Sequence, residues 1–563
     1  MSTTAGAAAS GPTSAASSAP GPTPAAPSPE LTWLLAIDPP TSLGDTDLVR
    51  LSPLDTANAP FIAALHALDA RAFAGPLGRV RPPWVFYDCL LASGVSLGHA
   101  SRTAEGLTPT SLLGFIPTLT PGLALIQTLA VDSAADARDL LTRARSLGLA
   151  DRFVVTLPWS SPLLAMLVSL GEVALEAAYL PSLDDPRTVT VRVTPGTPPT
   201  ASAPDIAPLR DPELVTHQAS LERGAELRLT RGLASIVVAP VIPAPSAPAP
   251  SAPSAPSASA ARAPRPTFAD DPRWDPRARP RLTTHNDALF ESLSPFIVAT
   301  RDHLAHADPA PFGLPTRWHL DPQRMDHAPF FWLLQRLDQL TFGPEGMPMD
   351  RWVFYDCAER PGLIYGFALP AAALSASERD TLRVPPDYQG PVPLSMYIAI
   401  PAASARPDTW FGHNLASLNR ALPERGLRHL GSITKAFALA AFRARHFLGA
   451  TQWTSSALFI HTKFGPLELR STWTPAHSIP ETLTYAFDVT ELSLRAAAGD
   501  PSARLTAPTP DLWLAADDRD GMRRLQAELE AGARYELCGP AAAPHLPEGA
   551  LARHHPIRAL PAR

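Results

Sequence analysis

The sequence contains few of the features that mark secreted, membrane or nucleic-acid-binding proteins. It has 3 cysteines in 563 residues, without the count of a disulfide framework or the spacing of zinc ligands. No stretch approaches the ~20 consecutive apolar residues of a membrane-spanning helix. Acidic residues outnumber basic ones by 53 to 47, which argues against a general affinity for nucleic acid or anionic membranes. Residues 1–30 lack the basic start and apolar core of a signal peptide. We therefore expect a cytoplasmic protein without nucleic-acid or membrane partners.

Proline is abundant, with 66 residues, and it is concentrated in a few tracts. Such tracts cannot build a hydrophobic core, so they predict extended or disordered segments. The sequence accordingly divides into a disordered tail (1–30), a first domain (31–238), a Pro/Ala-rich linker (239–268), a second domain (269–495) and a C-terminal extension (496–563).

A six-residue string, WVFYDC, occurs at 84–89 and again at 352–357. Before it stand APFIAALHALDARAFAGP, from Ala59, and APFFWLLQRLDQLTFGP, from Ala328, with apolar residues at helical spacing in both. After it, WSSPLLAMLVSLG corresponds to WTSSALFIHTKFG. Matching flanks on both sides indicate that a whole domain has been duplicated.

Both halves predict the same order of elements. An opening strand and an amphipathic helix precede a hairpin whose first strand is WVFYDC; then follow an apolar strand (123–131 or 392–400), a helix, a strand, a helix and a closing hairpin. This order predicts an α/β protein in which each half has a mixed sheet with helices on both faces. Aligning 123–131 with 392–400 places extra residues of the second half in 402–427. Insertions after a strand often shape a ligand site, so we expect a lid or acceptor wall there.

Two aromatic residues of this extra segment, Trp410 and Phe411, have two possible roles. They could cap a bound acyl or adenine group, or anchor the lid to the body of the domain.

The order of elements resembles the GNAT superfamily of N-acyltransferases, which use acetyl-CoA or other acyl-CoA donors and include tandem members. In that superfamily, a glycine-containing loop opens the helix that holds the CoA pyrophosphate. Arg428, Gly431 and Ser432 in RHLGSITKAF stand at the matching places, whereas VDSAADARDLL of the first half contains no glycine. The resemblance implies that only the second half binds acyl-CoA.

A second pattern of the superfamily lies on the helix after the fifth strand, where a tyrosine often protonates the departing CoA thiolate. His461 takes the place of that tyrosine, and Thr454 takes the place of a preceding asparagine. A histidine titrates near neutral pH, so His461 could act as a general acid, or it could be a structural helix residue. The resemblance also implies that the pantetheine arm lies between strands 392–400 and 447–453, beside Tyr397 and Ile398.

Acidic side chains supply the candidate general bases for an amine acceptor. Asp356, its counterpart Asp88 and Glu468 are such candidates, although an aspartate before a turn often bonds the local backbone instead. His477 stands near His461 in the sequence, but no third ligand has recognisable spacing, so we predict no metal. Cys89 and Cys357 are expected as small buried side chains rather than nucleophiles.

Together these patterns predict an acyl-CoA-dependent N-acyltransferase, with acetyl-CoA or another acyl-CoA as co-substrate. The acceptor would be a small-molecule or peptide amine, with the second half catalytic and the first structural. The alternative is a non-catalytic tandem GNAT-like scaffold or binding protein. The sequence does not indicate the oligomeric state.

Overall fold

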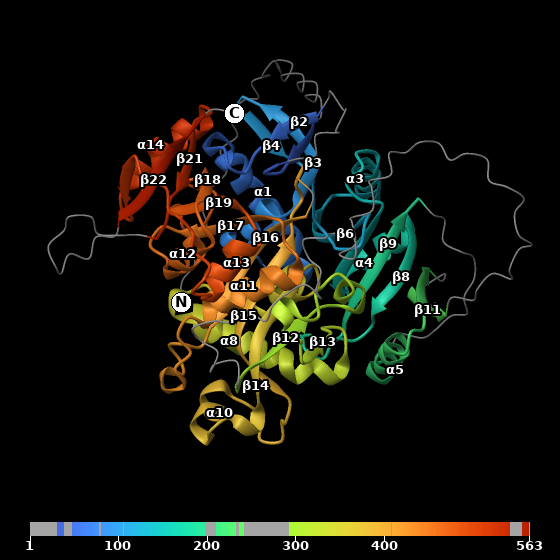
Figure 1. The fold of residues 1–563 in the computed structure, drawn as a ribbon. Coiled ribbons are helices and arrows are strands. Elements are labelled where there is room, and N and C mark those ends of the chain that lie inside the picture. Colours follow the sequence, from blue (N-terminus) through green and yellow to red (C-terminus); the bar gives the residue numbers. More distant parts are fainter. Residues whose placement is uncertain are drawn as a thin grey trace, which may run out of the picture.

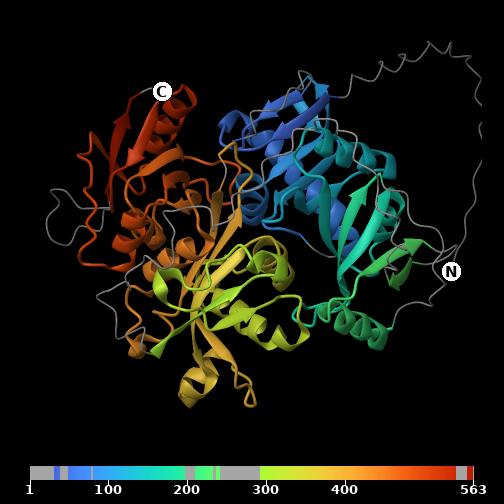
Figure 2. The ribbon, with the colours of Figure 1, turned by 45° about the vertical axis from the view of Figure 1, so that its right-hand side comes forward.

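The computed structural model describes residues 31–38, 48–77, 80–104, 106–196, 210–231, 236–240, 292–406, 408–540 and 554–561. The predicted tail (1–30) and most of the predicted linker (239–268) lie outside these residues. Figures 1 and 2 show the two halves side by side, the first coloured blue to green and the second yellow to red.

The first half is built on one mixed sheet with the strand order β11-β10-β8-β9-β7-β6-β5-β3-β1-β2, in which β4 pairs with β3. The strands are β1 (Leu31–Leu35), β2 (Leu48–Leu51), β3 (Val95–Thr103), β4 (Gly106–Pro109), β5 (Leu112–Pro117), β6 (Leu123–Ala130), β7 (Arg152–Pro158), β8 (Gly171–Ala177), β9 (Thr188–Pro195), β10 (Leu227–Arg231) and β11 (Ile236–Pro240). The longer helices are α1 (Ala59–Leu77), α3 (Ala134–Ser146), α4 (Pro162–Leu170) and α5 (Asp211–Glu222).

The second half has its own mixed sheet, ordered β13-β12-β14-β15-β16-β17-β19-β18-β21-β22-β20. Its strands are β12 (Ser294–Val298), β13 (Trp318–Leu320), β14 (Leu363–Pro370), β15 (Pro391–Pro401), β16 (Thr409–Ser417), β17 (His446–Gln452), β18 (Leu467–Ser471), β19 (Thr482–Asp488), β20 (Leu512–Ala515), β21 (Arg534–Leu537) and β22 (His554–Leu560). Its helices include α7 (Arg301–Leu304), α8 (Ala328–Phe342), α10 (Ala376–Leu382), α11 (Leu430–Phe442), α12 (Ser456–His461), α13 (Glu491–Ala498) and α14 (Arg519–Glu530).

The predicted fold class is confirmed: two mixed sheets carry helices on both sides. The two sheets also repeat one topology. The run β1-β3-β5-β6-β7-β9-β8 of the first sheet corresponds to β12-β14-β15-β16-β17-β19-β18 of the second. In each run one central pair is parallel, β6 with β7 and β16 with β17, and its neighbours are antiparallel. The shared order agrees with a duplicated domain.

The alignment of 123–131 with 392–400 is wrong. β6 begins its parallel pairing with Leu123 opposite Arg152, and β16 begins the same pairing with Thr409 opposite His446. The counterpart of β6 is therefore β16, which comes from the segment predicted to be a lid. Trp410 and Phe411 are buried residues of this central strand. Much of the extra length of the second half lies earlier, around α10 between β14 and β15.

The repeated string is helical, which corrects the prediction of a strand. In the first half a short helix, Pro83–Val85, continues into a π-helical segment, Phe86–Ala92. In the second half Arg351–Phe354 continues into Tyr355–Glu359 in the same way. Proline at the first position of a helix has no amide hydrogen to lose and has the right φ, so Pro83 is compatible with a helix start.

Each copy of the string packs against the diverging strands of the opposite half. Gln127 on β6 donates from Nε2 to the carbonyl oxygen of Asp356 (2.7 Å), and Cys357 donates to its Oε1 (3.5 Å). His413 holds the equivalent position on β16, with Nε2 3.4 Å from Cys89 Sγ and its ring stacked on Trp84. Both copies of the string therefore lie in the interface between the halves, in corresponding places.

Both sheets are extended by segments that follow the duplicated units. After α5, strand β10 pairs with β8, and β11 follows outward in the first sheet. In the second half β21 pairs with β18, and β22 and β20 follow outward, coloured red in Figure 1. Among the helices that the structure describes, none is long and apolar enough to cross a membrane.

Candidate functional site at the start of helix α11

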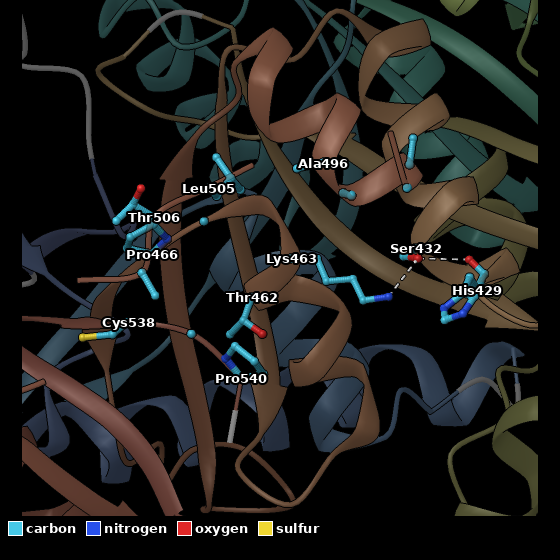
Figure 3. Close-up of a pocket in the computed structure, with 16 residues that line it drawn as sticks. His429, Ser432, Thr462, Lys463, Pro466, Ala496, Leu505, Thr506, Cys538 and Pro540 are labelled. Atoms are coloured by element: carbon cyan, nitrogen blue, oxygen red, sulfur yellow. Dashed lines mark hydrogen bonds between the residues drawn. The ribbon is translucent and has the colours of Figure 1, made fainter. Parts of the chain in front are cut away.

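A cavity of about 430 Å³ opens at the N-terminal end of α11 in the second half. Figure 3 shows its polar side, where Lys463 points toward Ser432 beside His429. Lys463 Nζ donates to Ser432 Oγ over 3.4 Å, and that hydroxyl donates to the carbonyl oxygen of His429 over 3.0 Å. Partial burial lowers the pKa of Lys463, because desolvation disfavours its charged form.

The start of α11 lacks a side-chain cap, and His429 before it adopts the left-handed conformation with φ of 65°. The first amide groups of a helix have no intrahelical acceptor and lie at the positive end of the helix dipole. Such a terminus beside a lysine is suited to a phosphate or carboxylate group.

The rest of the cavity is lined mostly by small, apolar residues. One wall is formed by Ala496, Ala497 and Ala498 at the end of α13. The opposite wall includes Leu505 and Cys538 of the C-terminal extension, which appear across from Ser432 in Figure 3. The cavity therefore accepts a ligand that has an anionic group at one end and an uncharged portion at the other.

The equivalent helix of the first half is closed. Ser133 caps α3 by accepting a hydrogen bond from the amide of Asp136 (3.1 Å), and its hydroxyl donates to the Asp136 carboxylate (2.7 Å). The carboxylate of Asp136 already provides negative charge in the first turn, which favours the helix dipole and repels a second anion. Only the second half offers an open helix start.

The parallel strands beside α11 are β16 and β17, which are not the pair named from the sequence. β15 and β17 are not neighbours, because β16 lies between them; the pantetheine position at 392–400 and 447–453 is therefore a wrong prediction. Tyr397 and Ile398 lie on β15 and pair with Leu415 and Asn414 of β16. The parallel pair β16 and β17 is joined from Thr409 to Gly412.

Beyond Gly412 the space between these two strands is filled from both sides. A side chain at Gly412 would overlap the rings of Tyr397 and Phe447, and one at Gly449 would come within 2.5 Å of Tyr485. These three rings surround Lys435, whose Nζ lies 4.5 Å from the centre of the Phe447 ring. On the other face, His413 meets the repeated string of the first half.

His461 lies in this filled region, not in the cavity. It is buried, and its Nδ1 is 2.9 Å from Nζ of the buried Lys435. Burial lowers the pKa of His461 well below its usual value, and Lys435 lowers it further; burial also strongly lowers the pKa of Lys435. A histidine that is neutral at physiological pH lacks the acidic imidazolium proton that would protonate a thiolate, so this geometry does not favour a general acid at His461.

The remaining predicted site residues are dispersed. Asp356 lies at the interface between the halves. Glu468 on β18 forms an ion pair with Arg534 of β21 at 3.2 Å. Arg428 and Thr454 are exposed, and Gly431 is packed beside Ile460 of α12. Of all the residues predicted from the sequence, Ser432 is the one that lines the cavity.

Sequence reasoning missed Lys463 and the far walls of the cavity. Lys463 stands 31 positions after Ser432, and no local pattern of the sequence joins the two. Nothing in the sequence indicates that the C-terminal extension folds back to this place. Among the described residues, no group of three His, Cys, Asp or Glu side chains is arranged to hold a metal ion.

Neither a comparison with protein-family models nor a search of curated proteins finds a match for this chain.

Proposed function

We propose that this protein binds a CoA-type ligand in its second half, as a tandem GNAT-like binding protein, with the first half in a structural role. One observation carries the proposal: the uncapped start of α11 opens into a cavity that contains Lys463. Phosphate oxygens would accept hydrogen bonds from the first amides of α11 and from Lys463 Nζ. The uncharged portion of the ligand would lie along α13 and the C-terminal extension.

The resemblance to the GNAT superfamily supports the choice of CoA among anionic ligands. In that superfamily the helix after the diverging strand holds the CoA pyrophosphate, and α11 follows β16 in this way. CoA combines a diphosphate with a long, largely uncharged arm, which agrees with the two ends of the cavity. The capped start of α3 supports a structural role for the first half.

Binding without transfer is favoured by the filled space between β16 and β17. A pantetheine arm needs room to bring its thioester to an acceptor, and the rings around Lys435 occupy that room. His461, the predicted acid, faces Lys435 and has a depressed pKa.

Acyl transfer to an amine is the second candidate function. It is favoured by the divergence of the parallel strands after Gly412, because parted strands expose backbone groups that could bind a pantetheine amide. This candidate requires the aromatic rings beside Gly412 to move when the ligand binds.

Titration calorimetry of the full chain with CoA, acetyl-CoA and pantetheine tests the proposal. We expect CoA and acetyl-CoA to bind and pantetheine, which has no phosphate, to bind at least tenfold more weakly, a difference of about 1.4 kcal/mol. Lys463→Gln should weaken CoA binding about tenfold because it removes a charge-assisted hydrogen bond. Arg428→Gln is the matched control, because it removes a charge from an exposed side chain that does not line the cavity.

Absence of CoA binding, or equal affinities of the Lys463→Gln and Arg428→Gln variants, would contradict the proposal. Release of free CoA thiol from acetyl-CoA in the presence of a panel of amines would instead support the second candidate function, acyl transfer.

A further inference from the structure

A second and larger cavity, of about 760 Å³, lies at a junction between the two halves. The first half contributes residues of β8, β9, α5 and β10 to its lining. The second half contributes residues of α7, β13 and the neighbouring loops, together with Arg360, which stands three positions after the repeated string. β13, β8 and α5 are labelled in Figure 1. This cavity exists because the halves are packed together.

Four buried polar atoms of residues that line the cavity have no hydrogen-bond partner among the described residues: Nε of Arg228, Oγ1 of Thr300, Nε2 of Gln323 and Nε of Arg360. Thr300 and Arg360 are the most deeply buried of these residues, each only 4% exposed. Thr300 stands at the N-cap position of α7 but makes no capping hydrogen bond. A buried donor without a partner costs free energy, so such groups usually meet a ligand or an ordered water.

The guanidinium of Arg360 is held in place by its other contacts. Its Nη2 pairs with the carboxylate of Glu176, which is also 3.6 Å from Arg192. Because Glu176 is shared between two arginines, these three side chains together keep one positive charge. Asp302 also lies close enough to raise the pKa of Arg360, and the wider lining contains both further carboxylates and further arginines. Burial would be expected to lower the pKa of Arg360, but the carboxylate of Glu176 raises it, and the side chain stays charged.

The duplication produced an equivalent junction on the other side of the interface, and that junction is closed. The residue equivalent to Arg360, three positions after the repeated string, is Ala92 in the first half. Ala92 packs with Leu91, Phe411 and Leu448 in one hydrophobic cluster, which also includes Ala486 at the position equivalent to Arg192. One junction is filled with apolar side chains, whereas the other keeps charged residues around an open cavity.

We propose that the cavity at this junction is a binding site for a small carboxylate molecule, separate from the cavity at α11. The carboxylate would accept hydrogen bonds from Arg360 Nε and Thr300 Oγ1 and would neutralise the remaining positive charge of the Arg192–Glu176–Arg360 group. The volume admits molecules larger than acetate, such as di- and tricarboxylates. The site needs both halves, so it makes ligand binding depend on their packing.

Thermal unfolding of the full chain with acetate, succinate, glutamate or citrate, and with sulfate as a non-carboxylate anion, tests the site. We expect at least one of the carboxylates to raise the midpoint of unfolding in a saturable manner. Thr300→Val keeps the shape of the side chain and replaces only the hydroxyl with a methyl group. We therefore expect the affinity for the carboxylate to fall at least about fivefold. Thr128→Val is the matched control, because it removes another buried hydroxyl without a partner, outside this cavity.

Equal binding by the Thr300→Val and Thr128→Val variants would overturn the proposal. The same conclusion follows if none of the four carboxylates binds, or if sulfate binds as well as the best carboxylate. Because CoA is absent from this experiment, its outcome is independent of the function proposed for the cavity at α11.

Discussion

The two halves share one topology but differ at the helix that follows the diverging strand. In the first half α3 is capped by Ser133 and has an acidic residue in its first turn. In the second half α11 starts without a side-chain cap, beside Lys463 and a cavity. A helix terminus can be completed by its own sequence or by a ligand. α3 shows the first solution, and we propose the second for α11.

A second difference lies next to the repeated string. Asp69 in the first half forms a buried ion pair with Arg81 at 3.0 Å. Its counterpart Asp338 has no arginine, because Met349 stands where Arg81 does; it accepts hydrogen bonds from the Met349 amide (3.0 Å) and from Asn414 (2.8 Å). Equivalent carboxyl groups are thus satisfied by a charge in one half and by neutral donors in the other.

The largest expected effect comes from removing the cation of the Asp69–Arg81 ion pair, so that the first half resembles the second at this position. Arg81→Met leaves Asp69 as a buried carboxylate without its cation, and we expect a loss of about 3–5 kcal/mol in the free energy of unfolding. Asp338→Asn should cost only about 1 kcal/mol, because burial raises the pKa of Asp338 to about 7 and the group already tolerates the neutral form. Urea unfolding of both variants measures the difference, and equal losses would contradict this account.

The next effect concerns the pH dependence contributed by Asp88 in the first copy of the string. Burial raises the pKa of Asp88 to about 8, and its Oδ1 has no hydrogen-bond partner. The folded state therefore keeps a proton on Asp88 that the unfolded state loses near pH ~4. The contribution of Asp88 to the free energy of unfolding is greatest below that pH and falls as the pH rises toward 8. The slope is at most about 1.4 kcal/mol per pH unit.

Asp88→Asn removes the titrating group and should flatten this dependence. Chemical unfolding at several pH values between 5 and 8 measures it. A variant with the same slope as the unmodified chain would show that the dependence arises elsewhere.

A smaller effect is expected at the capped helix. Ser133→Ala removes the cap of α3 and should lower the free energy of unfolding by about 1 kcal/mol. Threonine at the same position keeps a hydroxyl and should restore most of the loss. If Ser133→Ala had no effect in urea unfolding, the contrast between a closed and an open helix start would lose its physical basis.

The smallest expected change in stability belongs to Ser432→Ala on α11. Its hydroxyl bonds the His429 carbonyl and does not cap the helix, so the free energy of unfolding should change by less than about 0.5 kcal/mol. The affinity for CoA should fall several-fold, because Lys463 Nζ loses the acceptor that orients it. A stability loss as large as that of Ser133→Ala would mean that both helix starts are closed by their serines.

The sequence predicted the helices well where the spacing of apolar residues is regular. The runs from Ala59 and Ala328 were expected as amphipathic helices, and α1 and α8 begin at those residues. The repeated string was expected as a strand because Trp, Val, Phe and Tyr favour strands. It is buried against the opposite half, and tertiary packing overrides that local preference.

The candidate site was predictable only in part. Ser432 was found because a glycine-containing helix start is a local pattern, whereas Lys463 and the walls from α13 and the C-terminal extension come from distant segments. The position of β16 was also hidden. β15 is the more apolar of two consecutive strands, whereas β16 contains Gly412, His413 and Asn414, so the sequence favoured β15 as the counterpart of β6 until the pairing partners were known.

By itself the sequence determined that two halves share a repeated string with matching flanks, where the amphipathic helices beside it lie and which half has no glycine at the start of the later helix. These properties depend on residue types and spacings within short segments. Only the tertiary structure decided that each copy of the shared string contacts the opposite half and that β16 separates β15 from β17. It also decided that one junction between the halves is closed while the other is open. Those outcomes depend on contacts between residues hundreds of positions apart, and no short-range pattern records them.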